Sequence, residues 1–460
     1  MARRSRLIVM SNRLPVRRVK RHGRTIWEQS PGGLVSALTP ILRDRHGAWI
    51  GWTGGTGRSV EAFQIDGVEH RPVPLARHEV ESFYDGFSNR TLWPLYHDAV
   101  RAPEFRRRWW WPYVDVNRKF AEAAAATAKP GDTVWVHDYH LQLAPAMLRE
   151  MRDDVRIGFF LHIPFPPEEL FAHMPWRDRI IEGLLGADLI GFQTHAGVRN
   201  FAAAARRFGG ASGSSALLHH GGRSIRTGAF PISIDVAHFE SLAQDPGVLA
   251  RRDRLRDHLG RRRRVLLGVD RLDYSKGIDA RLKAFEETLR SGRVNASDAV
   301  FVQIAVPSRE EVQEYAELRG EVEQLVGRIN GEYGESGVAP VHYLHRSLGQ
   351  EELVAHYLAA DVMLVTPFRD GMNLVAKEYV ATRLDNTGVL ILSEFAGAAQ
   401  ELRSALMVNP HDVDGLAAGI QAALAVTDEE AHKRMESLRR AVRRNTVFQW
   451  ADRYLEALQS

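Results

Sequence analysis

The feature that most constrains the fold is a repeated pattern in the second half of the chain. A short apolar run is followed by a cluster of glycine and polar residues, and then by a stretch of helical composition. The pattern recurs about six times, with apolar runs at 265–269, 300–306, 341–344, 361–368, 388–392 and 406–408. Runs that are apolar at nearly every position are typical of strands buried on both faces. Strands that alternate with helices predict a doubly wound parallel sheet.

The first half shows the same pattern less regularly. Apolar runs lie at 7–10, 48–52, 133–136 and 156–161, and each is followed by glycine or polar residues. A chain of 460 residues is too long for one ordinary core and suits two or three domains. We therefore expect two α/β domains with a boundary near residues 235–242, followed at the C-terminus by an amphipathic helix over 447–458.

The turn after the run 361–368 is the first candidate for a ligand site. Asp370, Gly371, Met372 and Asn373 separate the expected strand from a helix that begins at Leu374. A glycine turn that leads into a helix presents backbone N–H groups to anions, and ligands of open α/β sheets collect at such strand ends. An ordinary turn with a capping Asp and a solvated Glu378 is an equally good interpretation of the local pattern.

Charged residues follow other expected strands. Arg271 and Lys276 lie five residues apart after the run 265–269, and their cations suit a diphosphate. Arg309 follows the next run at the same level of the sheet. In the first half, Asp138 and His162 each follow a strand, where sites of α/β proteins lie.

Three further features have a structural alternative of equal or greater weight. Gly32 and Gly33 open a helix and are a candidate phosphate cradle, although a plain turn explains them as well. Tyr84 and Trp93 suit a sugar pocket, because aromatic faces pack on sugar rings, but each is also a good core residue. The histidines near Asp138 have no zinc-ligand spacing, so a hydrogen-bonding role is favoured over a metal site.

Composition excludes several classes of protein. The chain has no cysteine, so disulfides, thiolate metal sites and a cysteine nucleophile are excluded. A formal charge of +4 does not argue for nucleic-acid binding. No run approaches the ~20 apolar residues of a membrane span, so we expect a cytoplasmic protein that is not bound to a membrane. The sequence has no GxGxxG after its first strand, no GxxxxGK[ST] and no GxSxG, which disfavours NAD(P) dehydrogenases, P-loop NTPases and α/β-hydrolases.

Five motifs together resemble the trehalose-6-phosphate synthase family, the retaining glycosyltransferases of family 20. They are RDGMNLVAKEYV (369–380), GVDRLDYSKG (268–277), GFFLHIPFP (158–166), SNRLPV with SPGG (11–16 and 30–33), and GFSNRTLWPLYH (86–97). The resemblance runs from about Leu7 to Leu458 and implies the GT-B fold, two Rossmann-like domains facing across a cleft. It implies an acceptor-binding domain over 1–238, a nucleotide-sugar-binding domain over 239–445, and a C-terminal helix over 446–460 that crosses back to the first domain.

The resemblance also implies a reaction and a set of residue roles. The family joins glucose from a nucleotide-glucose, a co-substrate, to glucose 6-phosphate. The implied glucose 6-phosphate site consists of Arg13, Tyr84, Trp93, Asp138 and Arg309. The implied nucleotide-sugar site consists of Gly32, Gly33, His162, Arg271, Lys276, Arg346, Asp370, Gly371, Met372, Asn373, Leu374, Val375 and Glu378. The implied catalytic set is Asp138, His162, Arg271, Lys276 and Asp370.

The family is described without a carboxylate nucleophile: the acceptor hydroxyl attacks from the side of the leaving group, whose phosphate takes the proton. Because Arg271 and Lys276 supply positive charge, we expect no metal and no other cofactor to be required. The residues leave UDP-glucose and GDP-glucose both open, and a homodimer or homotetramer is expected. The alternatives are a related pseudo-glycosyltransferase that couples cyclitols, a non-catalytic regulatory homologue, and a generic phosphorylase-like transferase.

Overall fold

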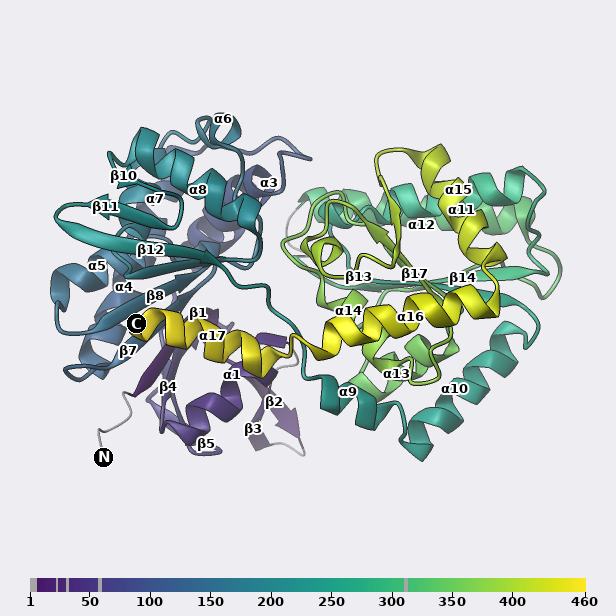
Figure 1. Cartoon of the computed structure of the whole chain (residues 1–460), viewed down its shortest axis with the longest axis horizontal. Helices are drawn as coiled ribbons and strands as arrows, with labels where there is room; N and C mark the ends of the chain where they lie inside the picture. The colour runs from purple at the N-terminus through teal and green to yellow at the C-terminus, as the bar shows by residue number, and fades with distance from the viewer. Residues whose placement is uncertain (1–5, 22–23, 30–32, 57–59, 310–312) are drawn as a thin grey trace. The chain divides into compact units, whose positions relative to one another are not determined.

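The computed structural model describes residues 6–21, 24–29, 33–56, 60–309 and 313–460. The chain forms two compact units (Figure 1). Unit 1 comprises residues 1–232 together with 447–460, and unit 2 comprises residues 233–446.

Unit 1 is built on a ten-stranded sheet. Its parallel strands are β1 (Leu7–Arg13), β4 (Ala48–Trp52), β6 (Val68–Pro72), β7 (Thr133–His137), β8 (Arg156–Phe160), β9 (Leu189–Phe192) and β12 (Arg223–Ala229). They lie in the order β12-β9-β8-β7-β1-β4-β6, so the strand order reverses between β1 and β7. Three antiparallel strands extend the edges: β5 (Phe63–Ile65), β10 (Ser212–Gly213) and β11 (Leu217–His220). A separate hairpin pairs β2 (Val16–Arg21) with β3 (Arg24–Gln29).

The helices of unit 1 follow the strands in the βαβ manner expected for a parallel sheet. The longer ones are α1 (Gly33–Asp44), α4 (Arg107–Thr127), α5 (Ala144–Met151), α7 (Arg177–Leu184), α8 (His195–Phe208) and α17 (Val447–Gln459). The shorter helical stretches are α2 (Arg77–Glu79), η1 (Val80–Leu92), α3 (Trp93–Tyr96), η2 (Tyr139–Leu141) and α6 (Glu168–Phe171). The wide, π-type helical stretch η1 was not expected from the sequence, which we interpreted there only as a collection of candidate binding residues.

Unit 2 has a six-stranded, fully parallel sheet. Its strands are β13 (Arg264–Arg271), β14 (Ala299–Val306), β15 (Val341–Leu344), β16 (Val362–Val365), β17 (Val389–Ser393) and β18 (Leu406–Val408). The order β15-β14-β13-β16-β17-β18 is the 3-2-1-4-5-6 order of doubly wound nucleotide-binding folds, which reverses between β13 and β16. The expected α/β fold class with two parallel sheets is therefore confirmed.

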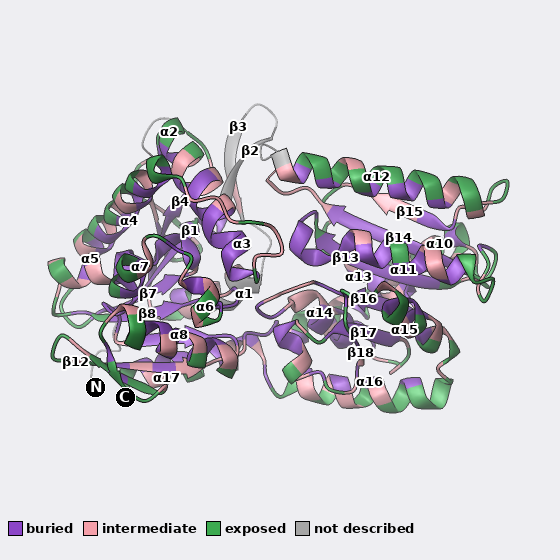
Figure 2. Cartoon of the chain, turned by 90° about the horizontal axis from the view of Figure 1, so that it is seen from above, coloured by how far each residue is buried: buried purple, intermediate pink, exposed green. Residues whose placement is uncertain are grey.

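Helices cover both faces of this second sheet. They are α9 (Val236–Leu242), α10 (Pro246–Leu259), α11 (Ile278–Arg290), α12 (Gln313–Tyr333), α13 (Gln350–Ala359), α14 (Leu374–Thr382), α15 (Val413–Ala425) and α16 (Asp428–Arg443), with short turns η3 (Tyr274–Lys276) and η4 (Gly397–Gln400). Figure 2 shows the central strands β13, β14, β16 and β17 largely in the buried colour, while α12 and α16 each expose one face. The apolar runs at 265–269, 300–306, 361–368 and 388–392 thus give central strands that are covered on both sides, whereas the edge strands β15 and β18 are partly exposed.

The C-terminal helix α17 belongs to the core of unit 1. It packs against α1, β8 and β9 (Figure 1), and its Trp450 and Tyr454 are fully buried. Arg156 and Arg226 both donate hydrogen bonds to the Leu458 carbonyl oxygen, at 2.9 and 3.4 Å. Cationic side chains satisfy the last carbonyls of a helix and complement its dipole, so they stabilise the end of α17.

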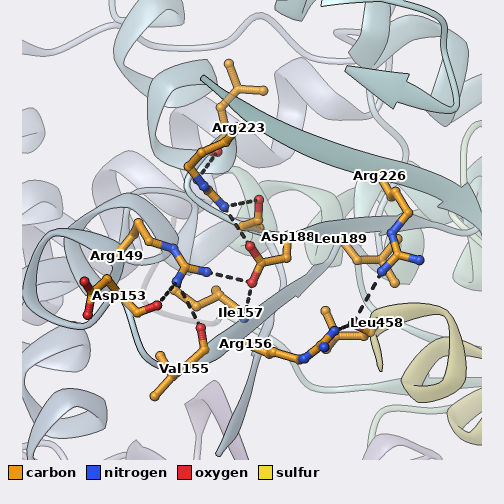
Figure 3. Close-up of polar contacts among 12 residues, drawn as sticks. Arg149, Asp153, Val155, Arg156, Ile157, Asp188, Leu189, Arg223, Arg226 and Leu458 are labelled. Atoms are coloured by element: carbon orange, nitrogen blue, oxygen red, sulfur yellow. Dashed lines mark hydrogen bonds and ion pairs between the residues drawn. The ribbon is translucent and has the colours of Figure 1, made fainter. Parts of the chain in front are cut away.

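Figure 3 shows these contacts of Leu458 and, beside them, a second cluster of polar residues around Asp188. Asp188 lies between Arg149 and Arg223, at N–O distances of 2.6 and 2.8 Å, and also accepts a hydrogen bond from the Ile157 backbone N–H. The carboxylate therefore ties α5, β8 and β12 together at one end of the sheet, next to the end of α17.

Candidate functional site

The reversal of strand order in unit 1 brings two predicted site residues to the same edge of the sheet. Arg13 is the last residue of β1, and Asp138 directly follows β7. These two strands are neighbours and parallel. Because open α/β sheets bind ligands outside the carboxyl ends of strands at such a switch point, this edge is the candidate site of unit 1.

Arg13 and Tyr84, both predicted site residues, are brought together here. The pairing of β1 with β4 shifts register between Met10 and Arg13, and such irregularities re-aim a side chain. The Arg13 guanidinium carbon lies 4.1 Å from the ring centroid of Trp52 and 5.4 Å from that of Tyr84. A guanidinium held by two aromatic rings is pre-oriented to bind an anion such as phosphate.

Trp93 is placed differently from these residues. Its side chain is only 3% exposed, and its ring packs 4.0 Å from His97 and 5.7 Å from Tyr139, measured between centroids. Trp93 is therefore mainly a core residue. Its predicted contact with phosphate stays a prediction.

Asp138 and His162 lie side by side. The Asp138 Oδ1 atom accepts a hydrogen bond from the His162 backbone N–H at 3.2 Å, which links the loops after β7 and β8. Asp138 has a φ of 74°, a left-handed conformation that is costly for a residue with a Cβ. Backbone strain of this kind clusters at functional sites, where the surrounding structure enforces it.

The switch point of unit 2 brings together the loops after β13 and β16. The Lys276 Nζ atom is 2.6 Å from Asp370 Oδ2, and the Phe368 backbone N–H donates to the Ser275 carbonyl oxygen at 2.8 Å. The side chains of Lys276 and Asp370 are 9% and 15% exposed, so the ion pair is mostly removed from water. Arg271, at the end of β13, remains exposed at the same edge.

Asp273 organises this loop, although the sequence analysis assigned it no role. Its buried carboxylate accepts hydrogen bonds from the Ser275 N–H and hydroxyl at 3.0 and 2.8 Å, and from Arg309 and the Tyr315 hydroxyl, both at 3.1 Å. Burial alone would raise the pKa of Asp273, but the charges of Arg309, Arg271 and Lys276 outweigh it and hold the pKa well below its ordinary value. The carboxylate therefore stays ionised and fixes the loop that carries Lys276.

Arg309 is held by the same carboxylate. Its side chain is 4% exposed and contacts Asp273 and the Tyr315 hydroxyl, and its backbone has a left-handed φ of 51°. Arg346, predicted in the nucleotide-sugar site, lies on the surface in an ion pair with Glu352 at 2.7 Å.

The start of α14 has the geometry of an anion site. Asn373, with a left-handed φ of 79°, caps the helix by accepting a hydrogen bond from the Ala376 N–H at 3.2 Å. The cap is therefore Asn373 and not Asp370, whose carboxylate contacts Lys276. The backbone N–H groups of Leu374 and Val375 lie in the first turn, where a helix offers no acceptor of its own.

The residues before this cap are fixed by a close backbone approach. The Ala398 N–H donates to the Met372 carbonyl oxygen at 2.8 Å, and the Gly397 N–H donates to the Asp370 carbonyl oxygen at 3.2 Å. A Cβ on Gly397 would lie 1.9 Å from the Gly371 carbonyl oxygen, so only glycine fits there. The loop after β17 thus supports the predicted sugar-binding turn.

Glu378 lies one turn further along α14. It accepts a hydrogen bond from the Tyr357 hydroxyl at 2.8 Å. Burial raises the pKa of Glu378, and the Tyr357 hydrogen bond offsets part of that shift. A carboxylate held in this way is suited to accept hydrogen bonds from hydroxyl groups of a ligand.

A buried arginine supports both loops of unit 2 and was also missed from the sequence. Arg281 is fully buried and donates to Asp270 at 2.8 Å, to Gln303 and Thr366 at 3.0 Å, and to the Lys276 carbonyl oxygen at 3.4 Å. Its position within a helix of ordinary composition gives no sequence pattern that would reveal this role.

Of the two glycines of the predicted phosphate cradle, the structure describes only Gly33. Gly32 lies outside the described residues, and Gly33 is the first residue of α1. Within the described part of the chain, no group of three or more His, Cys, Asp or Glu side chains is placed to hold a metal ion. None of the helices described has the length and apolar character needed to cross a membrane.

Comparisons with known proteins identify the family of the chain. Residues 5–460 match the model of glycosyltransferase family 20. The trehalose-6-phosphate synthase of Mycolicibacterium gilvum is 54% identical over 469 residues, which cover 98% of this chain and 93% of that protein. The α,α-trehalose-phosphate synthase (UDP-forming) from Burkholderia xenovorans in complex with glucose-6-phosphate has a TM-score of 0.91 at 35% identity, covering 99% of this chain and 100% of that one. A structure from E. coli bound with UDP-2-fluoro glucose has a TM-score of 0.92 at 35% identity, covering 99% of both chains.

Proposed function

The chain belongs to glycosyltransferase family 20, and we propose that it transfers glucose from UDP-glucose to glucose 6-phosphate with retention of configuration, giving α,α-trehalose 6-phosphate and UDP. The observation that carries the proposal is the switch point of unit 2. There, Lys276 pairs with Asp370, and Arg271 and the start of α14 lie at the same edge of a doubly wound parallel sheet. The relatives are synthases, which disfavours the cyclitol-coupling and regulatory alternatives.

On the donor side, Arg271, Lys276 and the N–H groups of Leu374 and Val375 bind the diphosphate, with the backbone of Gly32 and Gly33 as a further cradle. Glu378 accepts the ribose hydroxyls, and Arg346 faces the base. Asp370 and the N–H groups of Gly371, Met372 and Asn373 hold the hydroxyls of the donor glucose. The glycine-fixed loop geometry and the Asn373 cap support this assignment.

On the acceptor side, Arg13, Tyr84, Trp93 and Arg309 bind the phosphate of glucose 6-phosphate, and Asp138 contacts the sugars. The placement of the Arg13 guanidinium over two aromatic rings supports its role as an anion ligand. Guanidinium groups bind phosphate oxygens through paired N–H donors.

The chemistry follows from where charge develops. The glucosyl–oxygen bond breaks, the carbon passes through an oxocarbenium-like state, and negative charge grows on the departing diphosphate. Arg271 and Lys276 stabilise that charge. The acceptor hydroxyl bonds to the same face of the sugar, and its proton moves to the departing phosphate oxygen. Because positive side chains supply the charge, the proposal includes no divalent metal ion and no further cofactor.

Two further properties complete the proposal. We place the protein in the cytoplasm, where sugar phosphates and nucleotide sugars are made, and we expect a homodimer or homotetramer. Light scattering of the purified protein measures the second property directly.

The proposal is tested by offering UDP-, GDP- and ADP-glucose in parallel with glucose 6-phosphate, for the parent protein and for Arg309→Ala. We expect trehalose 6-phosphate with UDP-glucose as the best donor, and a raised KM for glucose 6-phosphate in the variant. Binding of nucleotide without product from any donor would contradict the proposal.

A further inference from the structure

Two histidines are hydrogen-bonded to each other at the switch-point edge of unit 1. His137 is the last residue of β7, and His162 follows the end of β8, its parallel neighbour. The His137 Nδ1 atom lies 3.0 Å from His162 Nε2, and the ring centroids are 5.3 Å apart. His162 is a predicted donor-site residue, whereas nothing in the sequence assigned a role to His137.

The pair is packed against the C-terminal helix. The Trp450 ring of α17 lies 6.5 Å from the His137 ring and 6.1 Å from the His162 ring, between centroids. Trp450 is itself fixed, because its Nε1–H donates to the Phe230 carbonyl oxygen at 3.1 Å. The anchoring of α17 by Arg156 and Arg226 therefore holds in place an aromatic side chain that supports both imidazoles.

Both imidazoles are neutral in this environment. His137 is fully buried, and burial together with the neighbouring His162 lowers its pKa well below the ordinary value. Burial lowers the pKa of His162 to about 3. With two neutral rings, one of the facing nitrogens carries a proton and the other accepts it.

The remaining nitrogen of His137 decides which ring donates. His137 Nε2 is buried and has no hydrogen-bond partner among the described residues. If His162 were the donor, the proton of His137 would have to sit on this nitrogen, as a buried N–H without an acceptor. Such N–H groups are rarer in folded proteins than acceptors without a donor. The proton of His137 therefore lies on Nδ1 and is donated to His162 Nε2.

We propose that His137 is a positioning residue that fixes His162 as the tautomer protonated on Nδ1. His162 then presents an N–H, and not a lone pair, to the ligand. This inference rests on the proposed function for the identity of that ligand, a hydroxyl oxygen of the transferred glucose. Hydrogen bonds to one ring nitrogen set the tautomer and the orientation of the other, which is how a buried partner acts through an imidazole.

The first test is spectroscopic and needs no activity. The protein is labelled with ¹⁵N-histidine, and long-range ¹H–¹⁵N correlations are recorded at pH 7.5, with His162 assigned by its loss in His162→Asn. We expect the pattern of a neutral ring protonated on Nδ1. A His162 ring protonated on Nε2 in the parent protein would overturn the proposal, whatever reaction the protein catalyses.

The second test uses variants that separate the hydrogen bond from packing. His137→Leu removes the donor, whereas His137→Asn keeps an N–H near the Nδ1 position. In His137→Leu we expect the His162 ring to lose its Nδ1–H pattern and kcat to fall about tenfold, while the KM for glucose 6-phosphate stays nearly unchanged. In His137→Asn we expect most of the His162 pattern and most of kcat to be restored.

The matched control is His70→Leu. His70 is another buried histidine of the same sheet, on β6, bonded to the Val68 carbonyl oxygen at 3.0 Å. We expect this variant to lower the Tm while kcat stays unchanged. If His137→Leu behaves in the same way, with an unchanged His162 pattern, His137 has only a packing role and the proposal is overturned.

Discussion

Lys276 and Asp370 form an ion pair of 2.6 Å that joins the loops after β13 and β16, the two strands between which the order of the second sheet reverses. The pair is mostly buried, so the two opposite charges stabilise each other, and Asn373 also donates a hydrogen bond to Asp370 at 3.2 Å. In the proposed reaction the two groups have different partners: Lys276 binds the diphosphate, and Asp370 binds the sugar. The ion pair thus holds both side chains at the switch point of the second sheet before a ligand binds.

Replacing Lys276 by Ala is expected to affect catalysis and stability together. Loss of one charge that stabilises the departing diphosphate lowers kcat by about 10²–10³. Loss of the cation that pairs with the mostly buried Asp370 carboxylate lowers the free energy of unfolding by about 3 kcal/mol. Steady-state kinetics and urea unfolding measure the two effects. The control is Lys283→Ala: the Lys283 side chain is 51% exposed and pairs with Asp279, so its removal should change neither quantity by much. A fully active Lys276→Ala enzyme would contradict the assignment.

Glu378→Gln is expected to stabilise the ligand-free protein while it raises the KM for the nucleotide sugar. Because burial raises the pKa of Glu378 above its ordinary 4.5, the folded protein binds this proton more tightly than the unfolded chain does. The stability contributed by Glu378 is complete below pH 4.5 and is lost as the pH rises through the raised pKa.

The Tm difference between Glu378→Gln and the parent should therefore grow from pH 4.5 toward pH 8. Glu287→Gln is the control with the opposite sign, because the hydrogen bond from Arg290 lowers the pKa of Glu287. If the Tm difference between Glu378→Gln and the parent shrinks as the pH rises, the pKa of Glu378 is not raised and the prediction is refuted.

Gly397→Ala tests the support of the sugar-binding turn. The added Cβ would meet the Gly371 carbonyl oxygen at 1.9 Å, so the loop after β16 must move. We expect a lower Tm and weaker binding of the nucleotide sugar, measured by calorimetry. Gly320→Ala, within α12 and with no atom within 4 Å of the new Cβ, should instead raise stability by about 0.5–1 kcal/mol. Equal effects of the two substitutions would show that the close approach has no role.

Removal of divalent metal ions is expected to leave the rate unchanged. In the proposed reaction, Arg271 and Lys276 supply the positive charge that a metal ion would otherwise provide. Activity is measured after dialysis against EDTA, with and without added Mg²⁺ or Mn²⁺. A loss of activity that either ion restores would show that the two side chains are insufficient.

Much of the second unit was predictable because its strands are apolar at most positions. The strands at 341–344 and 406–408 begin and end where the sequence indicated, and the run 361–368 gives the shorter strand β16. Strand order was not predictable beyond a doubly wound sheet, because pairing between distant strands leaves no local pattern.

Apolar patterns do not reveal the residues that hold the predicted site residues in place. Asp273 follows β13 and His137 ends β7, each in a polar cluster, and composition does not tell which member of such a cluster turns inward. Arg13 is aimed by a register shift in β1, which depends on the neighbouring strand. For Trp93 the opposite holds: its residue type suggested a sugar pocket, but its side chain is almost fully buried in the core.

The most direct test of the central claim is a single NMR experiment on the reaction mixture. UDP-glucose labelled with ¹³C at the anomeric carbon is incubated with the purified protein and unlabelled glucose 6-phosphate. We predict one labelled product, α,α-trehalose 6-phosphate, formed in step with UDP and with an α anomeric signal. Release of labelled free glucose, a β-linked product, or no turnover while UDP-glucose binds would contradict the account.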